Sequence, residues 1–593
     1  MRSLQTRLPG LLVKCSLLIA CGLAPARAAI QFFPLQDIKA GMRGAGKTVF
    51  SGGRIEDFQV EILGVLENIG PRQSLILARL SGGPLDSTGV MQGMSGSPVY
   101  IDGKLVGAVA MAFPFSKEPI AGIRPIADML GAAGKPAPKA AIRLTDTDVL
   151  AALPKRGETQ FGTARMMDIA TPVSFGGFTH EAVERFAPQL RALGLEPLQG
   201  ISGGGRISAA MGPRSALQPG SMISVQLVTG DLSMGADGTV THIDGERVYA
   251  FGHRFLSVGS TDLPFARSEV LTLLPSLSSS FKISTARELM GAISLDQNTA
   301  IAGELGRRAA MVPVSIRVAS PSGKRSSYNL EMVDDRLLSP FLLQLSVFSA
   351  IDATERTVGA SSFLVKGQIE FHDGAAPVKL DNMFAADANS AMQVALSAAI
   401  PLAYVLQGGF DALRIKQVAL DIESFDSKKQ LQIDHVFAGR REARPGESIE
   451  ITVGLAGENG ALVTRKAVYH APIGLSTGPL YFTVSDAGTA NLTDFRQIIG
   501  ASPRSPGQLI STVNQLKVNT KVYVRVWRAN AAFQMQGEDY PAPPPSLAMI
   551  LARAQNGYGG LSQTYNSKLA ELEIDGIGAV VTGSKTIQVD IKE

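Results

Sequence analysis

The chain has 593 residues, with 56 lysines and arginines against 52 aspartates and glutamates. Segment 1–28 holds four of the basic residues and no acid, so its removal would leave 52 of each sign. This balance argues against a nucleic-acid partner, which requires an excess of basic side chains. The 62 glycines, 33 prolines and 18% charged residues indicate a turn-rich, mostly β globular protein that is long enough for several domains.

Residues 1–28 have the features of a secretory signal. Three basic residues come before or at the start of the apolar stretch Cys15–Ala24, and Ala26-Arg27-Ala28 forms a small-residue cleavage site. We therefore expect export to the periplasm or the extracellular space. We expect no transmembrane span after signal cleavage.

The signal has a second interpretation, because Leu18-Ile19-Ala20-Cys21 resembles a lipobox. The protein would then be a lipoprotein anchored at Cys21, although the apolar run before this cysteine is short. Both cysteines, Cys15 and Cys21, fall inside the signal. The mature chain would therefore have no disulfide, no cysteine-ligated metal and no cysteine nucleophile.

Residues Gly41–Thr48 satisfy the G-x-x-x-x-G-K-[ST] pattern of nucleotide-binding loops. That pattern binds phosphate only where a helix begins directly after it. The next residues, Val49–Gly53, predict a strand running into a turn instead. We therefore expect no nucleotide at this segment.

The segment Gly93–Pro98, with the sequence Gly-Met-Ser-Gly-Ser-Pro, is the most informative part of the chain. An attacking serine leaves negative charge on the substrate carbonyl oxygen, which unshielded backbone N–H groups stabilise. Ser95 fits the nucleophile, and the amides of Gly93 and Ser95 fit an oxyanion hole. The G-x-S-x-G pattern is excluded, because Ser97 occupies its last glycine position. A glycine-rich turn with incidental serines is the alternative.

A hairpin is predicted directly after this segment. Asp102-Gly103 is a strong two-residue turn signal, so Val99–Ile101 should pair antiparallel with Lys104–Val109.

Residues 40–130, approximately, resemble the SpoIVB peptidase family. The resemblance is carried by Thr88–Gln92, the serine segment and the apolar strand after it. A second patch, Gly238–His253, is similar to the histidine segment of that family, within about residues 216–266. The resemblance implies a chymotrypsin-like serine peptidase with two β-barrel lobes and Ser95 as the nucleophile. It also implies selective cleavage of a protein partner.

His253 is the first candidate for the base among the six histidines. Gly252 precedes it, and a hairpin turning at Asp244-Gly245 places it at the end of the strand Arg247–Phe251. His242, on the opposite arm of that hairpin, is the second candidate. A histidine on a strand is usually packed or solvated, so this role depends on the serine segment.

The acidic member of a triad is harder to place. The family has an aspartate a little upstream of the serine, whereas Leu80–Pro84 contains no acid. Asp86 lies on the other side of Pro84, so we rank Asp262 first and Asp244 next as the group that orients His253. A Ser-His dyad and an inactive relative remain the alternatives.

The predicted fold class is mainly β: a chymotrypsin-like, two-lobed β-barrel peptidase domain in serine-first order, followed by a β-sandwich-like C-terminal region. Chain order does not restrict the chemistry, because the same triad geometry occurs in different orders. The expected segments are a signal peptide (1–28), a serine lobe (29–139), a connecting segment (140–215), a histidine lobe (216–350), a mixed α/β segment (351–430), a β-sandwich-like domain (431–540), and a C-terminal helix and strand (541–593).

Besides the C-terminal helix, two helices are predicted within these segments. One begins at the N-cap Thr179 and ends at Gly194, with an apolar stripe on one face. The other, Ala391–Leu406, is apolar but too short to span a bilayer comfortably, so we expect a buried helix.

The sequence thus favours an exported serine endopeptidase that cleaves a protein or peptide through an acyl-enzyme on Ser95. No metal-ligand spacing or cofactor motif is present, so we expect neither a metal nor a cofactor. The alternative is a catalytically inactive, peptidase-like envelope protein that acts as a binding or signalling scaffold.

Overall fold

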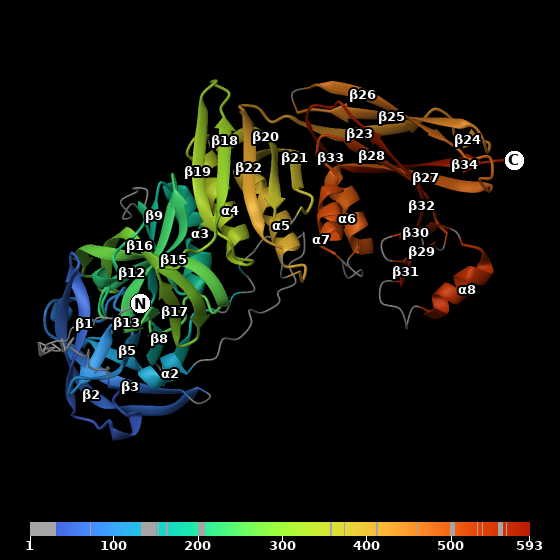
Figure 1. Ribbon diagram of the computed structural model, residues 1–593. Helices are drawn as coiled ribbons and strands as arrows, with labels where there is room; N and C mark the ends of the chain where they lie inside the picture. The colour runs from blue at the N-terminus through green and yellow to red at the C-terminus, as the bar shows by residue number, and fades with distance from the viewer. Residues whose placement is uncertain are drawn as a thin grey trace, which may run out of the picture.

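A computed structural model of the protein describes residues 31–593, apart from 71–72, 132–149, 151–152, 154, 162–163, 200–207, 356–357, 373, 411–412, 459, 499–504, 531, 536–537, 542, 555–560 and 565. The expected signal of residues 1–28, with Cys15 and Cys21, lies outside the described residues. Most of the described chain is in strands, which confirms the mainly β fold class. The two barrels lie at one end of the molecule and the C-terminal sandwich at the other (Figure 1).

Six strands close the first barrel. They are β1 (Arg43–Ser51), β2 (Arg54–Gly70), β3 (Gln73–Ser81), β4 (Pro98–Ile101), β5 (Lys104–Ala112) and β6 (Ile120–Pro125). Their order is β4-β1-β2-β3-β6-β5, and pairing of β4 with β5 completes the ring. The hairpin after the serine segment is confirmed, because Ile101 pairs with Lys104 and both turn residues have positive φ.

A second ring of six strands follows in the chain. It consists of β12 (Met222–Gly230), β13 (Ser233–Asp244), β14 (Arg247–Ala250), β15 (Gly259–Leu274), β16 (Phe281–Gln297) and β17 (Ala300–Leu305). The order is β13-β14-β17-β16-β15-β12, and β12 pairs with β13 to close it. The two-barrel architecture in serine-first order is therefore confirmed.

The two barrels are joined by main-chain hydrogen bonds. Gly52, in the turn between β1 and β2, and Val270 of β15 exchange two N–H···O bonds of 2.8 Å each. This contact fixes the turn between β1 and β2 against β15 of the second barrel.

The segment between the barrels contributes strands to both sheets. β7 (Glu158–Phe161) pairs with β8 (Ala164–Asp168), and β8 pairs with β5 of the first barrel. β9 (Thr171–Gly176) and β10 (Leu195–Gln199) extend the sheet of the second barrel. The helix predicted here is α3 (His180–Ala192), and the Thr179 hydroxyl accepts from the N–H of Ala182 as expected for an N-cap.

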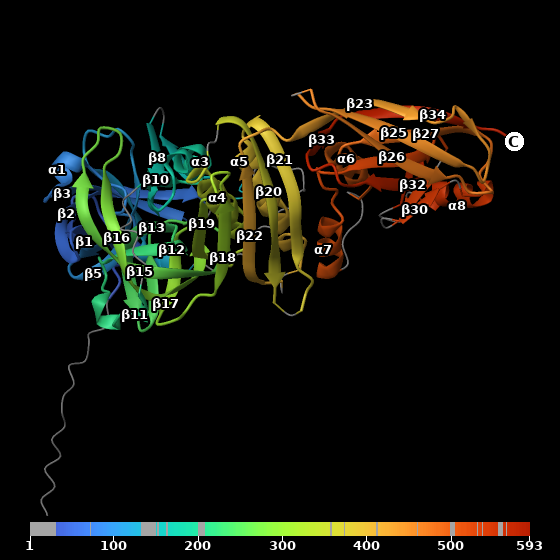
Figure 2. The same cartoon turned by 90° about the horizontal axis from the view of Figure 1, so that it is seen from above.

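The sheet of the second barrel continues beyond the ring. β18 (Met311–Ala319), β19 (Arg325–Val333), β20 (Val358–Phe371), β21 (Val378–Ala388) and β22 (Ile415–Phe425) extend it. The helices α4 (Leu338–Asp352) and α5 (Ser390–Leu406) pack against one another, and they share the core of this sheet (Figure 2). The buried helix predicted from Ala391 is confirmed as α5. No helix within the described ranges has the length and apolar character needed to cross a bilayer.

The C-terminal region is a sandwich of two sheets over one core. One sheet has the order β26-β25-β23-β33 and the other β24-β34-β27-β28-β32. Their strands are β23 (Gln430–Ala438), β24 (Glu442–Ala443), β25 (Ser448–Ala456), β26 (Leu462–His470), β27 (Gly478–Ser485), β28 (Val522–Arg528), β32 (Ser567–Ile574), β33 (Val580–Thr582) and β34 (Ser584–Ile591). The last three strands thus complete the sandwich rather than form a separate terminal unit.

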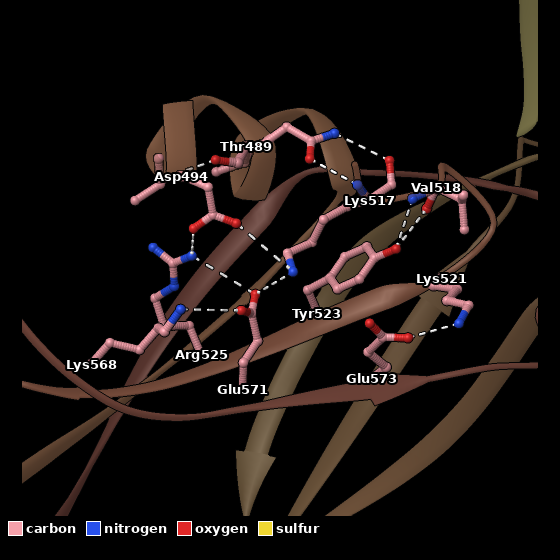
Figure 3. A network of polar contacts seen from close by, with 12 residues as sticks. Thr489, Asp494, Lys517, Val518, Lys521, Tyr523, Arg525, Lys568, Glu571 and Glu573 are labelled. Carbon is pink, nitrogen blue, oxygen red and sulfur yellow. Dashed lines mark hydrogen bonds and ion pairs between the residues drawn. The ribbon is translucent and has the colours of Figure 1, made fainter. Parts of the chain in front are cut away.

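An ion-pair network joins a helix to one sheet of the sandwich (Figure 3). Asp494 lies on α6 (Ala487–Ile498), Arg525 on β28 and Glu571 on β32. Lys517 Nζ lies 3.2 Å from Glu571 Oε1 and 3.8 Å from Asp494 Oδ2, and Arg525 also pairs with Asp494. These side chains are at most about a quarter exposed, so the network links α6 to the sheet.

The remaining elements are short or peripheral. They are η1 (Leu35–Asp37), α1 (Leu85–Thr88), α2 (Ile126–Leu130), β11 (Ser208–Met211), η2 (Arg214–Ala216), α7 (Pro506–Asn514), β29 (Ala532–Met535), β30 (Glu538–Pro541), α8 (Pro545–Ala554) and β31 (Leu561–Thr564).

Candidate active site

The serine segment forms a tight double turn between α1 and β4. The N–H of Met94 donates to the carbonyl of Met91, and the N–H of Ser97 donates to that of Met94. Gly93 and Gly96 have φ values of +87° and +92°, a region that only glycine occupies without strain. A Cβ on Gly96 would lie 2.0 Å from a carbonyl oxygen of β13, so the glycine also permits close contact with the second barrel.

Two threonines of β13 hold this turn against the second barrel. Thr239 donates its N–H to the carbonyl of Ser95 and its hydroxyl to the carbonyl of Gly93, both at 2.9 Å. Thr241 donates its hydroxyl to the carbonyl of Gly96 at 2.7 Å. The predicted nucleophile therefore lies at the junction of the two barrels.

His253 follows β14 and lies at the same junction. The N–H of Gly96 donates to the carbonyl of Val109 at 2.8 Å. The Cα of Gly252 packs against that same carbonyl, because a Cβ there would lie 3.2 Å from the oxygen. Phe251, next to Gly252, donates its N–H to the carbonyl of Thr239 at 3.2 Å. The structure thus brings the two predicted segments together, although they are far apart in sequence.

The side chains of Ser95 and His253 are both buried. The Oγ of Ser95 and the Nε2 of His253 have no hydrogen-bond partner among the residues that the structure describes, so no hydrogen bond joins them. His253 Nδ1 lies 2.6 Å from the carbonyl of Arg254. A carbonyl only accepts, so Nδ1 carries the proton and the lone pair of Nε2 is free. Burial lowers the pKa of His253, which favours this neutral form.

Asp262, the acid ranked first from the sequence, is occupied elsewhere. Its two carboxylate oxygens accept from Arg307 Nη2 and from the N–H of Ala310, each at 2.9 Å. Burial lowers the pKa of His253, the charges of Arg156 and Arg124 lower it further, and the Asp168 carboxylate at the end of β8 acts in the opposite direction. Sequence reasoning missed Asp168 because only the pairing of β8 with β5 brings it near the histidine.

A second buried acid organises the loop after His253. Asp296 of β16 accepts from the N–H groups of Phe255, Leu256 and Val258 at 2.8, 2.7 and 3.2 Å. Burial raises the pKa of Asp296 to about 6, and these N–H bonds act in the opposite direction. Sequence reasoning did not identify this residue, since its partners lie on a loop about 40 positions away.

The amides expected to form the oxyanion hole are available. Within the described part of the chain, neither the N–H of Gly93 nor that of Ser95 donates a hydrogen bond, whereas those of Met94, Gly96 and Ser97 do. Unsatisfied N–H groups at a buried site are rare in folded proteins, so this pair fits an anion-binding role.

The other sequence candidates occupy different surroundings. His242 contacts Phe32 edge to face and stacks on Tyr249; burial lowers its pKa, and the charge of Asp244 acts in the opposite direction. The Gly41–Thr48 segment runs into β1, so no helix follows the nucleotide-like pattern. Among the described histidines, cysteines and acids, no group of three or more clusters as metal ligands would.

A pocket of about 340 Å³ lies beside the serine turn. Gln92 forms part of its wall, together with residues 112–116 after β5 and the serine-rich loop 276–280. Neither Ser95 nor His253 lines this pocket, and their exposed fractions are 0% and 2%. The site is therefore closed to solvent in this structure.

A glycine-flanked serine with free amides, at the junction of two six-stranded barrels and near a histidine loop, is typical of two-barrel serine peptidases. The family model of the SpoIVB peptidase S55 matches residues 26–127, which include the whole serine segment. The resemblance noted from the sequence is thereby confirmed for the first barrel. The matched range ends before the second barrel, so the assignment of His253 rests on geometry. Searches of curated proteins and of solved structures gave no match.

Proposed function

We propose that the protein is an exported serine endopeptidase of the SpoIVB type. Ser95 Oγ attacks the scissile carbonyl, and His253 Nε2 takes its proton and later protonates the leaving amine. The N–H groups of Gly93 and Ser95 stabilise the oxyanion. The single observation that carries this proposal is the convergence of the serine turn and the histidine loop on the carbonyl of Val109.

In this proposal Asp262 has no catalytic role. The carbonyl of Arg254 fixes the tautomer of His253, and the Asp168 carboxylate stabilises the imidazolium that forms during attack. This arrangement is closer to a Ser-His dyad with a remote charge than to a hydrogen-bonded triad.

The enzyme acts on a protein partner only after the serine turn opens. Ser95 is fully buried, and the pocket lined by Gln92, three residues before Ser95, offers space for a substrate side chain. The loop 276–280 contacts the turn, because the N–H of Gln92 donates to the carbonyl of Ser280 at 2.9 Å. Movement of this loop would expose the nucleophile, which suits a peptidase held latent until its partner binds.

The test is labelling with a fluorophosphonate, with the modified residue located by peptide mass spectrometry. We expect an adduct on Ser95 in the wild type and its loss in Ser95→Ala. Ser51→Ala, which changes an exposed serine of β1, is the matched control and should label like the wild type. Labelling that never reaches Ser95 in the folded protein would contradict the proposal.

An inactive scaffold is the second candidate. The observation that favours it is the absence of a hydrogen bond between Ser95 and His253, both of which are sealed from solvent. A scaffold predicts no adduct on any serine of the segment, at any pH and with any added protein substrate.

A further inference from the structure

Lys282 is a fully buried lysine next to the serine turn. It lies at the start of β16, and its N–H donates to the carbonyl of Gln92 at 3.2 Å. Its aliphatic stem packs on Gly93, where a Cβ would lie 3.2 Å from Cδ. No carboxylate pairs with it among the residues described, which is unusual for a buried lysine. The proposed mechanism gives this amine no role.

The Lys282 amine is connected to the serine segment through one hydroxyl. Lys282 Nζ lies 2.7 Å from Oγ1 of Thr48 on β1, and Ser97 Oγ donates to the same Thr48 oxygen at 3.1 Å. All three side chains have 0% exposure. The chain of contacts therefore runs from the second barrel, through β1, to the residue two positions after Ser95.

The hydrogen bonds that link Ser97, Thr48 and Lys282 are best satisfied when the Lys282 amine is neutral. Ser97 already donates to Thr48, so the hydroxyl hydrogen of Thr48 needs an acceptor of its own. In the structure Lys282 Nζ donates to Thr48 Oγ1. A neutral amine also has a lone pair that can accept the Thr48 hydrogen in turn, whereas an ammonium can only donate. Burial without an anion acts in the same direction, because it lowers the pKa of Lys282 to about 7.

We propose that Ser97, Thr48 and Lys282 form a second nucleophile relay within the serine segment, in which Lys282 is the proton acceptor and Ser97 receives an acyl group. As Ser97 Oγ bonds to the carbonyl carbon of an ester or amide, its proton passes to Thr48. The Thr48 hydroxyl proton passes to Lys282 Nζ, which then protonates the leaving group. Serine nucleophiles served by lysine are an established variant of this chemistry. This proposal concerns the same serine turn as the proposed function, but it does not require Ser95 to be the nucleophile.

The test uses the full chain carrying Ser95→Ala and the small probe phenylmethanesulfonyl fluoride. In the reaction the S–F bond breaks, fluoride leaves, the Ser97 Oγ–S bond forms, and the proton ends on Lys282. We expect peptide mapping to locate the adduct on Ser97. Adding Lys282→Met, which keeps the apolar stem, should slow its formation by at least about 100-fold, the usual effect of losing a base.

Thr48 provides a matched pair of variants in the same background. Thr48→Ser keeps the relay hydroxyl and should keep the adduct, whereas Thr48→Val keeps the shape and should lose it. Circular dichroism and thermal unfolding check that each variant is folded. No adduct on Ser97 in the folded Ser95→Ala protein would overturn the inference, as would equal rates in the Thr48→Ser and Thr48→Val variants. The proposed function fails on a different observation, the absence of an adduct on Ser95 in the wild type.

Discussion

The backbone N–H of Thr239 donates to the carbonyl oxygen of Ser95 at 2.9 Å, across the junction of the two barrels. The Thr239 hydroxyl makes a second bond of the same length to Gly93. Together these bonds hold the 93–94 and 95–96 peptide groups, which lie on either side of the peptide group that carries the Ser95 N–H. In the proposed mechanism, the second barrel therefore holds the turn that carries the oxyanion amides as well as the histidine.

Removal of the Thr239 hydroxyl should loosen the oxyanion site. Thr239→Val keeps the shape of the side chain but leaves the Gly93 carbonyl without this donor, at a cost of about 1–2 kcal/mol in unfolding free energy. We expect fluorophosphonate labelling of Ser95 to slow by about tenfold, as this free energy corresponds to such a factor. Thr239→Ser, which restores the hydroxyl, should label at the wild-type rate. Equal rates for the valine and serine variants would show that the bond has no influence on the site.

Two acids of the second barrel, Asp296 and Asp262, can be compared to find which of them supports the His253 loop. The structure favours Asp296, whereas the sequence favoured Asp262. Asp296→Asn replaces a carboxylate that accepts three N–H bonds from the loop after His253, so it should lower both labelling and stability. We expect a loss of about 2 kcal/mol, measured by urea unfolding. Asp262→Asn is the matched control and should change the labelling rate less than twofold, since Asp262 pairs with Arg307. The reverse order of effects would restore Asp262 as the orienting acid.

Local signals in the sequence identified much of this fold. The Asp102-Gly103 turn, the Thr179 cap and the serine segment each depend on neighbours in the chain, and the structure has the turn and the cap as expected. The partners of the site could not be found in this way. Thr239 and Lys282 reach the serine turn only because the second barrel packs on the first, and no local pattern distinguishes them from other strand residues. Asp262 was chosen for its closeness to His253 in sequence, which does not measure distance in space.

The stability of the protein should depend on the protonation of Lys282. Its pKa is lowered from 10.5 to about 7 in the folded state, so between these values the unfolded chain binds more protons. Stability therefore rises with pH in this window and is lowest below pH 7. We expect the unfolding free energy of the wild type to gain about 2 kcal/mol between pH 7 and pH 9 relative to Lys282→Met. A constant difference between the two proteins over this range would mean that Lys282 is charged when buried.

The ion-pair network of the C-terminal sandwich should support stability without affecting the chemistry. Glu571→Gln removes the charge that Lys517 faces at 3.2 Å, while Asp494 remains as its weaker partner. We expect the unfolding free energy to fall by about 2 kcal/mol, because Lys517 and Glu571 are only 13% and 15% exposed. Labelling of Ser95 should remain unchanged. If this substitution lowers the labelling rate, the C-terminal sandwich influences the reactivity of Ser95, contrary to this expectation.

In the proposed mechanism His253 takes the proton of Ser95, so the rate of adduct formation at Ser95 depends on this imidazole. We predict that His253→Ala lowers this rate by at least about a thousandfold, the usual effect of removing the base of a serine hydrolase. His242→Ala, which removes a ring packed between Phe32 and Tyr249, should change it less than about threefold. A large loss in His242→Ala with an unchanged rate in His253→Ala would contradict the assignment.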